Sequence, residues 1–222
     1  MFHCIVMAAG QSHRFGTNKL LQSVQGLPLY CHLFQRLQQL QQAQPEVFDV
    51  TVVSRFPEIQ EASSAARFHY VLNDAPEAGL SRTIELGIRA QLGKLGEIPP
   101  LSAAQTQQGL ASRQVSLERR SQARNTGWIF FTADQPYVSL NSLQRFFERC
   151  QYSPADLITV ASEARLGNPC YFSLHFTEEL LKLSGDQGGR LVMQAHPELC
   201  CEQVLVPDWE LDDVDRPSDL PD

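Results

Sequence analysis

A loop rich in small residues, spanning residues 7–20, carries the first candidate chemistry in the chain. It follows an apolar run over residues 2–7 that has the composition of a buried strand. Small residues allow a tight turn with free backbone N–H groups, and the loop adds two cations, Arg14 and Lys19. Free amides and cations at the end of a first strand suit a polyphosphate ligand. The other candidate binding residues of the loop are Ala8, Ala9, Gly10, Gln11, Ser12 and Gly16.

The spacing of this loop excludes two common phosphate-binding motifs. A P-loop has the pattern GxxxxGK[ST], but here five residues separate Gly10 from Gly16, and Lys19 comes three residues after Gly16. The dinucleotide fingerprint GxGxxG does not occur in the loop either. On the residues alone, an ordinary strand-to-helix turn with solvated charges therefore stays open as the alternative.

Acidic residues that could face this loop occur late in the chain. Asp134 directly follows the apolar run over residues 128–133, and a carboxylate at the carboxyl end of a central strand lies where open α/β sheets bind ligands. Asp-Gln-Pro is also a common turn sequence, so a purely structural role stays open. Residues 207–222 hold seven acidic side chains against one arginine, with Asp213 and Asp215 among them. This end is either a solvated tail or a segment beside a metal ion.

Hydrophobic periodicity and turn residues predict an α/β fold. The strand-helix alternation of the first half predicts a parallel sheet with right-handed crossovers. No room remains for a crossover helix before residues 170–173, which predicts one antiparallel strand. The predicted strands are residues 2–7, 50–54, 70–72, 128–133, 157–161, 170–173 and 204–206. The predicted helices are one opened by Pro28, one over 58–67, one through Ile84 with Ser81 as its N-cap, one over 140–150, one over 176–183 and a short one opened by residues 185–190.

Length and charge bound the class of protein. The 222 residues suit a single domain over 1–222, in which residues 93–127, rich in Gln and Ser without a clear period, are predicted to be a mobile insertion. Nearly all of the net charge of −7 comes from the acidic end, so the body is close to neutral, which argues against nucleic acid as a partner. No apolar run approaches the roughly 18 residues of a membrane span. A signal-peptide pattern is also missing from residues 1–30, so no membrane partner and a cytoplasmic location are expected.

Residues 8–19 match the pattern AAGxSxRFGxxK, which is far more specific than a glycine pair. The pattern resembles the N-terminal signature of the nucleotidyltransferases of molybdenum-cofactor maturation and of their sugar-phosphate relatives. Its Ala-Ala-Gly form looks like the cytidylyltransferase branch, because the guanylyltransferase branch usually has Ala-Gly-Gly. Further segments resemble this family in the same order: Gly79-Leu80-Ser81, Ala133-Asp134-Gln135-Pro136 for GDQP, Gly167-Asn168-Pro169 for Gly-His-Pro, residues 185–190 for GDxGAR and residues 213–220 for DIDTPEDL.

The resemblance implies a three-layer, Rossmann-like nucleotidyltransferase fold with a mostly parallel sheet and one antiparallel strand. It implies a Mg²⁺-dependent enzyme that transfers CMP from CTP to the phosphate of molybdopterin, with a molybdenum hydroxylase as candidate client. Arg14 and Lys19 would hold the phosphates, and Asp134, the third candidate catalytic residue, would bind Mg²⁺ with Asp213 or Asp215. The further nucleotide and acceptor contacts implied by the resemblance are Gly79, Leu80, Ser81, Gln135, Asn168 and Asp186.

Nucleotidyl transfer of this kind does not require a general base. The second pKa of a phosphate monoester is about 6, so the attacking phosphate is already ionised. Catalysis must then come from positioning and from neutralising charge around the phosphorus. Departures from the family pattern at Arg82, Thr83, Ala133 and Asn168 leave two alternatives. One is a protein of the same fold that binds and delivers the cofactor without turnover, and the other is a nucleotidyltransferase acting on a sugar or polyol phosphate.

Overall fold

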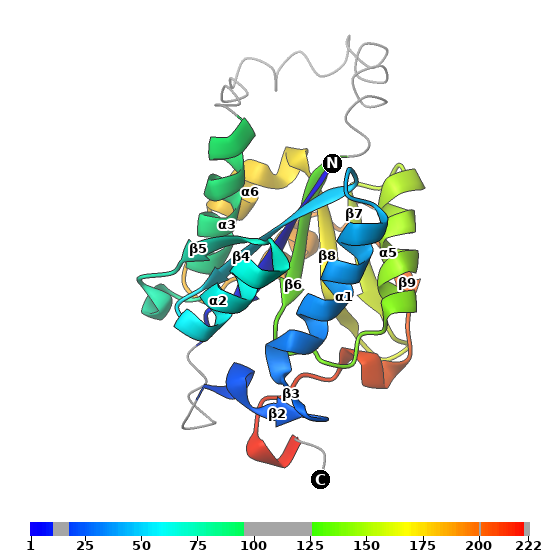
Figure 1. The fold of residues 1–222 in the computed structure, drawn as a ribbon. Helices are drawn as coiled ribbons and strands as arrows, with labels where there is room; N and C mark the ends of the chain where they lie inside the picture. The colour runs from blue at the N-terminus through cyan, green and yellow to red at the C-terminus, as the bar shows by residue number, and fades with distance from the viewer. Residues whose placement is uncertain (11–17, 96–125, 200, 220–222) are drawn as a thin grey trace.

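One sheet of seven strands forms the centre of the molecule (Figure 1). A computed structural model describes residues 1–10, 18–95, 126–199 and 201–219. The strands of the sheet are β1 (Phe2–Ala8), β4 (Phe48–Ser54), β5 (His69–Leu72), β6 (Gly127–Thr132), β7 (Leu157–Ala161), β8 (Leu166–Ser173) and β9 (Cys201–Leu205). Their order is β5-β4-β1-β6-β8-β7-β9, and within the described ranges only β8 runs antiparallel to its neighbours. A separate hairpin is made by β2 (Ser23–Val24) and β3 (Leu27–Pro28).

The first strand lies in the middle of the parallel part of the sheet. β1 pairs with β4 on one side and with β6 on the other, so that Ala8 lies beside Ser54 and Met7 beside Thr132. Because parallel strands point the same way, the carboxyl ends of β1, β4 and β6 meet at one edge of the sheet. Open α/β sheets bind ligands at this kind of edge.

Helices cover both faces of the sheet, which gives three layers (Figure 1). They are α1 (Leu29–Ala43), α2 (Pro57–Ala66), α3 (Leu80–Leu95), α5 (Leu140–Tyr152), α6 (Thr177–Leu181) and α7 (Gly189–Ala195). One core lies between the sheet and α1, α2 and α5, with Ile59 and Phe146 fully buried in it. The other lies between the sheet and α3, α6 and α7, with Ile88 and Leu180 fully buried. No helix in the described ranges is long and apolar enough to cross a bilayer.

The predicted fold class is confirmed, including the single antiparallel strand. Two local predictions are corrected. Ser81 is not an N-cap, because α3 begins at Leu80 and places Ser81 in its first turn. The predicted bounds of the insertion, residues 93–127, are too wide at both ends. Residues 93–95 belong to α3, which continues to Leu95, and Gly127 is the first residue of β6. Residues 96–125 lie outside the described part of the chain.

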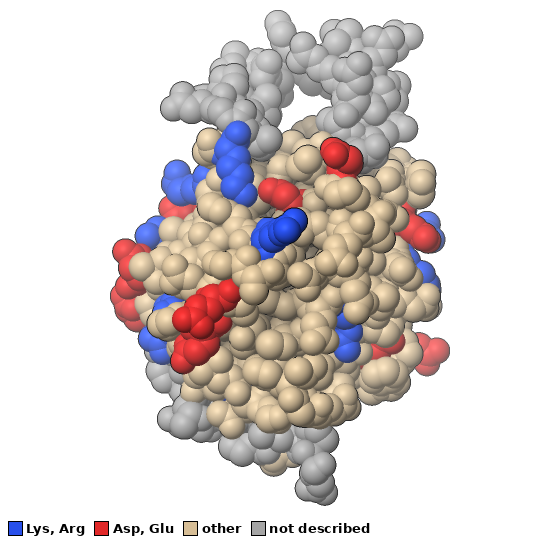
Figure 2. Space-filling view, in the orientation of Figure 1, with Lys and Arg blue, Asp and Glu red and all other residues tan. Residues whose placement is uncertain are grey.

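Charged side chains of both signs are scattered over the face of the molecule that Figure 2 shows, and most of the surface between them is uncharged. Several ion pairs among the described residues join neighbours on one helix, such as Arg89 with Glu85 and Lys182 with Glu178. Exposed pairs of this kind stabilise a protein by less than about 1 kcal/mol each. The two apolar cores therefore contribute most of the stability of the fold.

The two interior glycines of α3, Gly87 and Gly93, should respond to alanine with opposite signs. A Cβ at Gly87 would lie 2.5 Å from Cγ2 of the buried Ile5 on β1, and overpacking of this kind costs about 1–3 kcal/mol. Among the described residues, a Cβ at Gly93 would meet no heavy atom within 4 Å outside its own stretch of helix, so Gly93→Ala should stabilise the protein by about 0.5–1 kcal/mol through helix propensity. Urea unfolding measures both changes. Equal stability of the two variants would contradict the packing of α3 on β1.

Candidate active site

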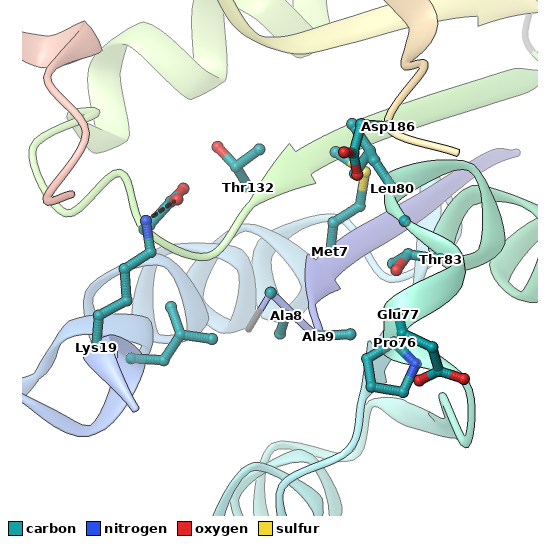
Figure 3. A pocket seen from close by; sticks show the side chains of 14 residues that line it. Met7, Ala8, Ala9, Lys19, Pro76, Glu77, Leu80, Thr83, Thr132 and Asp186 are labelled. Carbon is teal, nitrogen blue, oxygen red and sulfur yellow. Dashed lines mark hydrogen bonds and ion pairs between the residues drawn. The ribbon is translucent and has the colours of Figure 1, made fainter. Parts of the chain in front are cut away.

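A pocket of about 360 Å³ opens at the carboxyl edge of β1 and β6 (Figure 3). The ends of these strands lie between Lys19 on one side and the start of α3 on the other. Four stretches of chain far apart in the sequence contribute to its walls: residues 7–10 with 19–20, residues 76–83, residues 132–134, and Asp186. The parallel pairing of β1 and β6 explains why the first and third of these stretches meet.

Lys19 joins two carboxylates at this edge. Its ammonium Nζ donates to Oδ2 of Asp134 and to Oδ1 of Asp215, each at 2.7 Å. The lysine side chain is only 12% exposed, and burial alone would lower its pKa. The two carboxylates outweigh burial and raise the pKa of Lys19, because they favour the charged form. The ammonium is therefore a fixed positive charge at the pocket.

The C-terminal segment reaches Lys19 because a backbone hydrogen bond holds it beside the turn that follows β6. The backbone N–H of Val214 donates to the carbonyl oxygen of Asp134 at 3.1 Å, and the Val214 side chain is fully buried. Oδ2 of Asp219 accepts the backbone N–H groups of Asp215 and Arg216 at 3.0 and 2.8 Å. These bonds fix the direction in which the Asp215 side chain leaves the backbone. The acidic end is thus a structured part of the site.

Asp213 lies next to this group and titrates differently from an ordinary aspartate. The pKa of Asp213 is raised to about 6, chiefly because the surrounding protein desolvates the carboxyl and also because the carboxylates of Asp134 and Asp215 lie nearby. The side-chain amide of the buried Gln135 hydrogen-bonds the carboxyl and acts in the opposite direction. Three carboxyl groups and one ammonium therefore share a small region, with negative charge in excess.

Two buried polar atoms at the pocket have no hydrogen-bond partner among the described residues: Oδ1 of Asp134 and Oγ1 of Thr132. Buried polar atoms are nearly always hydrogen-bonded in proteins, so both are available to a ligand. The described side chains include no cluster of three or more His, Cys, Asp or Glu arranged for a metal. Mg²⁺ commonly binds one or two carboxylates together with substrate phosphates instead of an all-protein cage. The oxygens of Asp134 and Asp215 fit that mode.

A second pocket of about 180 Å³ adjoins the first, and Met7, Leu80 and Thr132 line both. It lies toward β8 and α7, where Asn168 and Arg190 contribute its main polar groups. Most of its remaining lining is apolar. The shared wall means that two ligands bound side by side would approach each other near the end of β6.

The start of α3 and the loop before α7 are in direct contact. A Cβ at Gly79 would clash with the backbone carbonyl group of Gly185, and Gly79 has a φ of +89°, so only glycine fits. The N–H of Ser81 donates to the carbonyl oxygen of Gly185 at 3.0 Å. This contact brings Asp186 to the first pocket, on the same side as Leu80.

Most of the predicted site residues that the structure describes come together. Those lining the first pocket are Ala8, Ala9, Gly10, Lys19, Gly79, Leu80, Asp134 and Asp186. Asn168 lines the second pocket, and Asp215 reaches the site through Lys19. Gln135 and Ser81 line neither pocket and act through their contacts with Asp213 and Gly185. The predictions for Gln11, Ser12, Arg14 and Gly16 lie outside the described residues.

Sequence reasoning missed six residues of the first pocket: Met7, Leu20, Pro76, Glu77, Thr83 and Thr132. Only Thr132 carried a usable signal, since it is a polar residue near the end of an apolar strand, two positions before Asp134. Thr132 is the last residue of β6 and lies at the same edge of the sheet as Asp134, so a role for Asp134 implies one for Thr132. In the sequence, Thr83 differs from the family pattern and gives no other signal.

Solved structures share this fold at low sequence identity. A nucleotidyl transferase from Methanothermobacter thermautotrophicus is 21% identical with a TM-score of 0.67, over 99% of this chain and 94% of that chain. Molybdopterin-guanine dinucleotide biosynthesis protein A from Archaeoglobus fulgidus is 14% identical with a TM-score of 0.56, over 99% and 94%. A CMP:2-keto-3-deoxy-manno-octonic acid synthetase complexed with CTP is 12% identical with a TM-score of 0.60, over 98% and 94%. These likenesses show the fold alone.

The family assignment comes from the sequence of the whole domain. No curated protein matches the chain. Residues 4–199, which are most of the chain, match the model of the MobA-like NTP transferase domain. The match includes the lining residues of both pockets but not the C-terminal segment that carries Asp213 and Asp215. The chain therefore belongs to the MobA-like NTP transferase family of nucleotidyltransferases.

Proposed function

We propose that the protein transfers CMP from CTP to the phosphate of molybdopterin and releases pyrophosphate. The observation that carries this proposal is the charged Lys19, held by Asp134 and Asp215 at the edge of a pocket built from the small residues of the first loop. A fixed cation, backbone amides and carboxylates for a metal are the groups that phosphate chemistry requires. The resemblance of residues 8–19 to the cytidylyltransferase branch supports the choice of CTP and of molybdopterin.

The reaction joins one phosphate oxygen of the acceptor to the α-phosphorus of CTP. The bond from that phosphorus to the bridging oxygen of the β-phosphate breaks, and its electron pair leaves with pyrophosphate. The acceptor phosphate is ionised near neutral pH, since its second pKa is about 6, so no residue needs to remove a proton. The protein has to align the two phosphates and stabilise the charge that develops on the leaving group.

The described residues divide this work between the two sides of the first pocket. Lys19 would contact the triphosphate from one side, where its charge stabilises developing negative charge. The positive end of the α3 dipole faces the pocket from the other side, since Gly79, Leu80 and Thr83 line it. Asp134 and Asp215 are placed to hold Mg²⁺, which when bound would neutralise phosphate charge.

The second pocket is the proposed site of the acceptor. Its mostly apolar lining suits a flat fused ring, and Asn168 and Arg190 offer polar contacts at its wall. The shared residues Met7, Leu80 and Thr132 separate it from the first pocket by a single layer of side chains. An acceptor phosphate directed past Thr132 would approach the α-phosphate of a nucleotide bound in the first pocket.

Pyrophosphate release with matched acceptors tests the proposed function. The purified protein is incubated with CTP and Mg²⁺ and with molybdopterin, with a sugar phosphate or with no acceptor, and each mixture is repeated with EDTA. We expect pyrophosphate only with molybdopterin and Mg²⁺, in equal amount to a cytosine dinucleotide product. Turnover with the sugar phosphate and not with molybdopterin would show that the acceptor is a sugar phosphate. Binding of both ligands without pyrophosphate would contradict an enzyme and favour a delivery protein.

Replacing Lys19 should remove most of the activity. Lys19→Ala is expected to lower kcat/KM by about 100-fold or more, the usual effect of removing a group that stabilises transition-state charge. Lys182→Ala is the matched control, because that lysine is 74% exposed and pairs with Glu178 on the surface. Pyrophosphate release measures both rates, and melting temperatures show whether each variant is folded. Near-normal turnover of a folded Lys19→Ala protein would exclude the proposed role.

The preference for CTP over GTP should depend on the size of the side chain at position 9. Ala9 is buried and lines the first pocket, where its methyl group takes space that glycine would leave to a purine. Discrimination by shape is about 10- to 200-fold, or about 1–3 kcal/mol. With CTP and GTP at equal concentration, mass spectrometry should show mainly the cytosine product, and Ala9→Gly should raise the guanine share. A guanine product dominating in the wild type would reverse the branch assignment.

A further inference from the structure

A row of buried polar residues lies behind the wall of the first pocket: Ser54, Asn73 and Thr83. Oγ of Ser54 donates to the carbonyl oxygen of Ala8 at 2.8 Å. The N–H of Asn73 donates to the carbonyl oxygen of Ser54 at 2.8 Å, and the side-chain Nδ2 of Asn73 donates to Oγ1 of Thr83 at 3.1 Å. The row therefore connects the end of β1 to the first turns of α3, and Thr83 is the member that lines the pocket.

The direction of the bond between Asn73 and Thr83 is set by a third residue. The backbone N–H of Ala75 lies 3.1 Å from Oδ1 of Asn73, and an N–H can only donate, so the amide oxygen must face Ala75. The NH₂ group of Asn73 therefore faces Thr83, and the Thr83 oxygen must accept. The hydroxyl proton of Thr83 is left to donate elsewhere. No acceptor for it is found among the described residues.

Lys19 and Thr83 lie on opposite sides of the pocket, and the Thr83 side chain is on the pocket side of α3 (Figure 3). A nucleotide whose triphosphate is bound near Lys19 would extend its base toward Thr83. Cytosine offers two acceptors to such a donor, its O2 and N3 atoms. Thr83 is 4% exposed, so this hydrogen bond would form largely out of water, where a missing partner is costly.

We propose that Asn73 is a positioning residue that fixes the Thr83 hydroxyl as a hydrogen-bond donor toward the nucleotide base. This inference rests on the proposed function only in requiring that the pocket binds a nucleoside triphosphate. Asn73 touches no ligand itself. It accepts from Ala75, donates to Thr83 and so determines which hydrogen-bonding group the pocket presents to the base.

An isosteric substitution of Asn73 can distinguish orientation of the Thr83 hydroxyl from simple structural support of the loop that contains Asn73. Asn73→Asp keeps the shape and still accepts the N–H of Ala75, but its second oxygen would accept the Thr83 hydroxyl proton instead of donating. The pocket would then present an acceptor to the base. Thr83→Val removes the hydroxyl at similar volume, and Thr83→Ser keeps it. Inorganic tripolyphosphate is the matched ligand without a base.

Titration calorimetry with Mg²⁺ measures the Kd for CTP and for tripolyphosphate. We expect Asn73→Asp and Thr83→Val each to raise the Kd for CTP about ten-fold, the effect of losing one buried hydrogen bond. The double variant should lose no more than either single variant, because both remove the same interaction. Thr83→Ser should bind CTP like the wild type, and the Kd for tripolyphosphate should be unchanged in all four proteins.

Three results would each overturn the inference. The first is a double variant whose Kd for CTP rises by the product of the two single effects. The others are a Kd for tripolyphosphate that rises as much as the Kd for CTP, and a Thr83→Val variant that binds CTP like the wild type. If Asn73→Asp does not fold, the comparison of Thr83→Val with Thr83→Ser decides alone. A wild type that binds GTP more tightly than CTP would contradict the proposed nucleotide. The inference is then tested with GTP, whose O6 and N7 atoms are also acceptors.

Discussion

One partly buried ammonium between two carboxylates determines how this site is assembled. Lys19 belongs to the first loop, Asp134 lies two residues after the end of β6 and Asp215 belongs to the C-terminal segment, so the three meet only in the folded chain. Removing the ammonium charge of Lys19 from water is costly, and the two carboxylates offset this cost and raise the pKa of Lys19. One ammonium and two carboxylates leave negative charge in excess. A polyanionic triphosphate would therefore bind there more readily together with a divalent cation, which explains why a phosphate site contains carboxylates.

The sequence was sufficient to predict the sheet and to predict that the first loop and Asp134 lie at the same edge of it, because both follow from local patterns. β1 and β6 are continuous apolar runs that end in small or acidic residues, and parallel pairing then places Ala8 and Asp134 at one edge. Other features depend on contacts between distant segments. The start of α3 is determined by the close approach of Gly79 to Gly185, which no local capping pattern indicates. The donor role of Thr83 depends on Asn73 and Ala75 in the same way.

Two adjoining pockets explain how one edge of the sheet can serve a reaction with two substrates. The parallel half of the sheet, β5-β4-β1-β6, carries the loop and α3, while β8 and α7 carry Asn168 and Arg190. Ligands bind where the strand order reverses in open α/β sheets, and here the order reverses between β1 and β6, because the chain runs from β1 through β4 to β5 on one side and resumes with β6 on the other. Met7, Leu80 and Thr132 belong to both pockets, so a substitution at any of them would change the wall of both. A substitution of a residue that lines only one pocket would change the wall of that pocket alone.

The same geometry determines where the chain can accept extra length. α3 begins at the pocket and runs for 16 residues, about 24 Å at 1.5 Å per residue, so Leu95 lies at the opposite edge of the sheet. β6 begins at that edge with Gly127 and ends at the pocket with Thr132. The end of α3 and the start of β6 therefore lie at the edge of the sheet away from the first pocket (Figure 1). Because the entropy of closing a loop grows slowly with its length, additional residues at that edge are tolerated without constraint from the site.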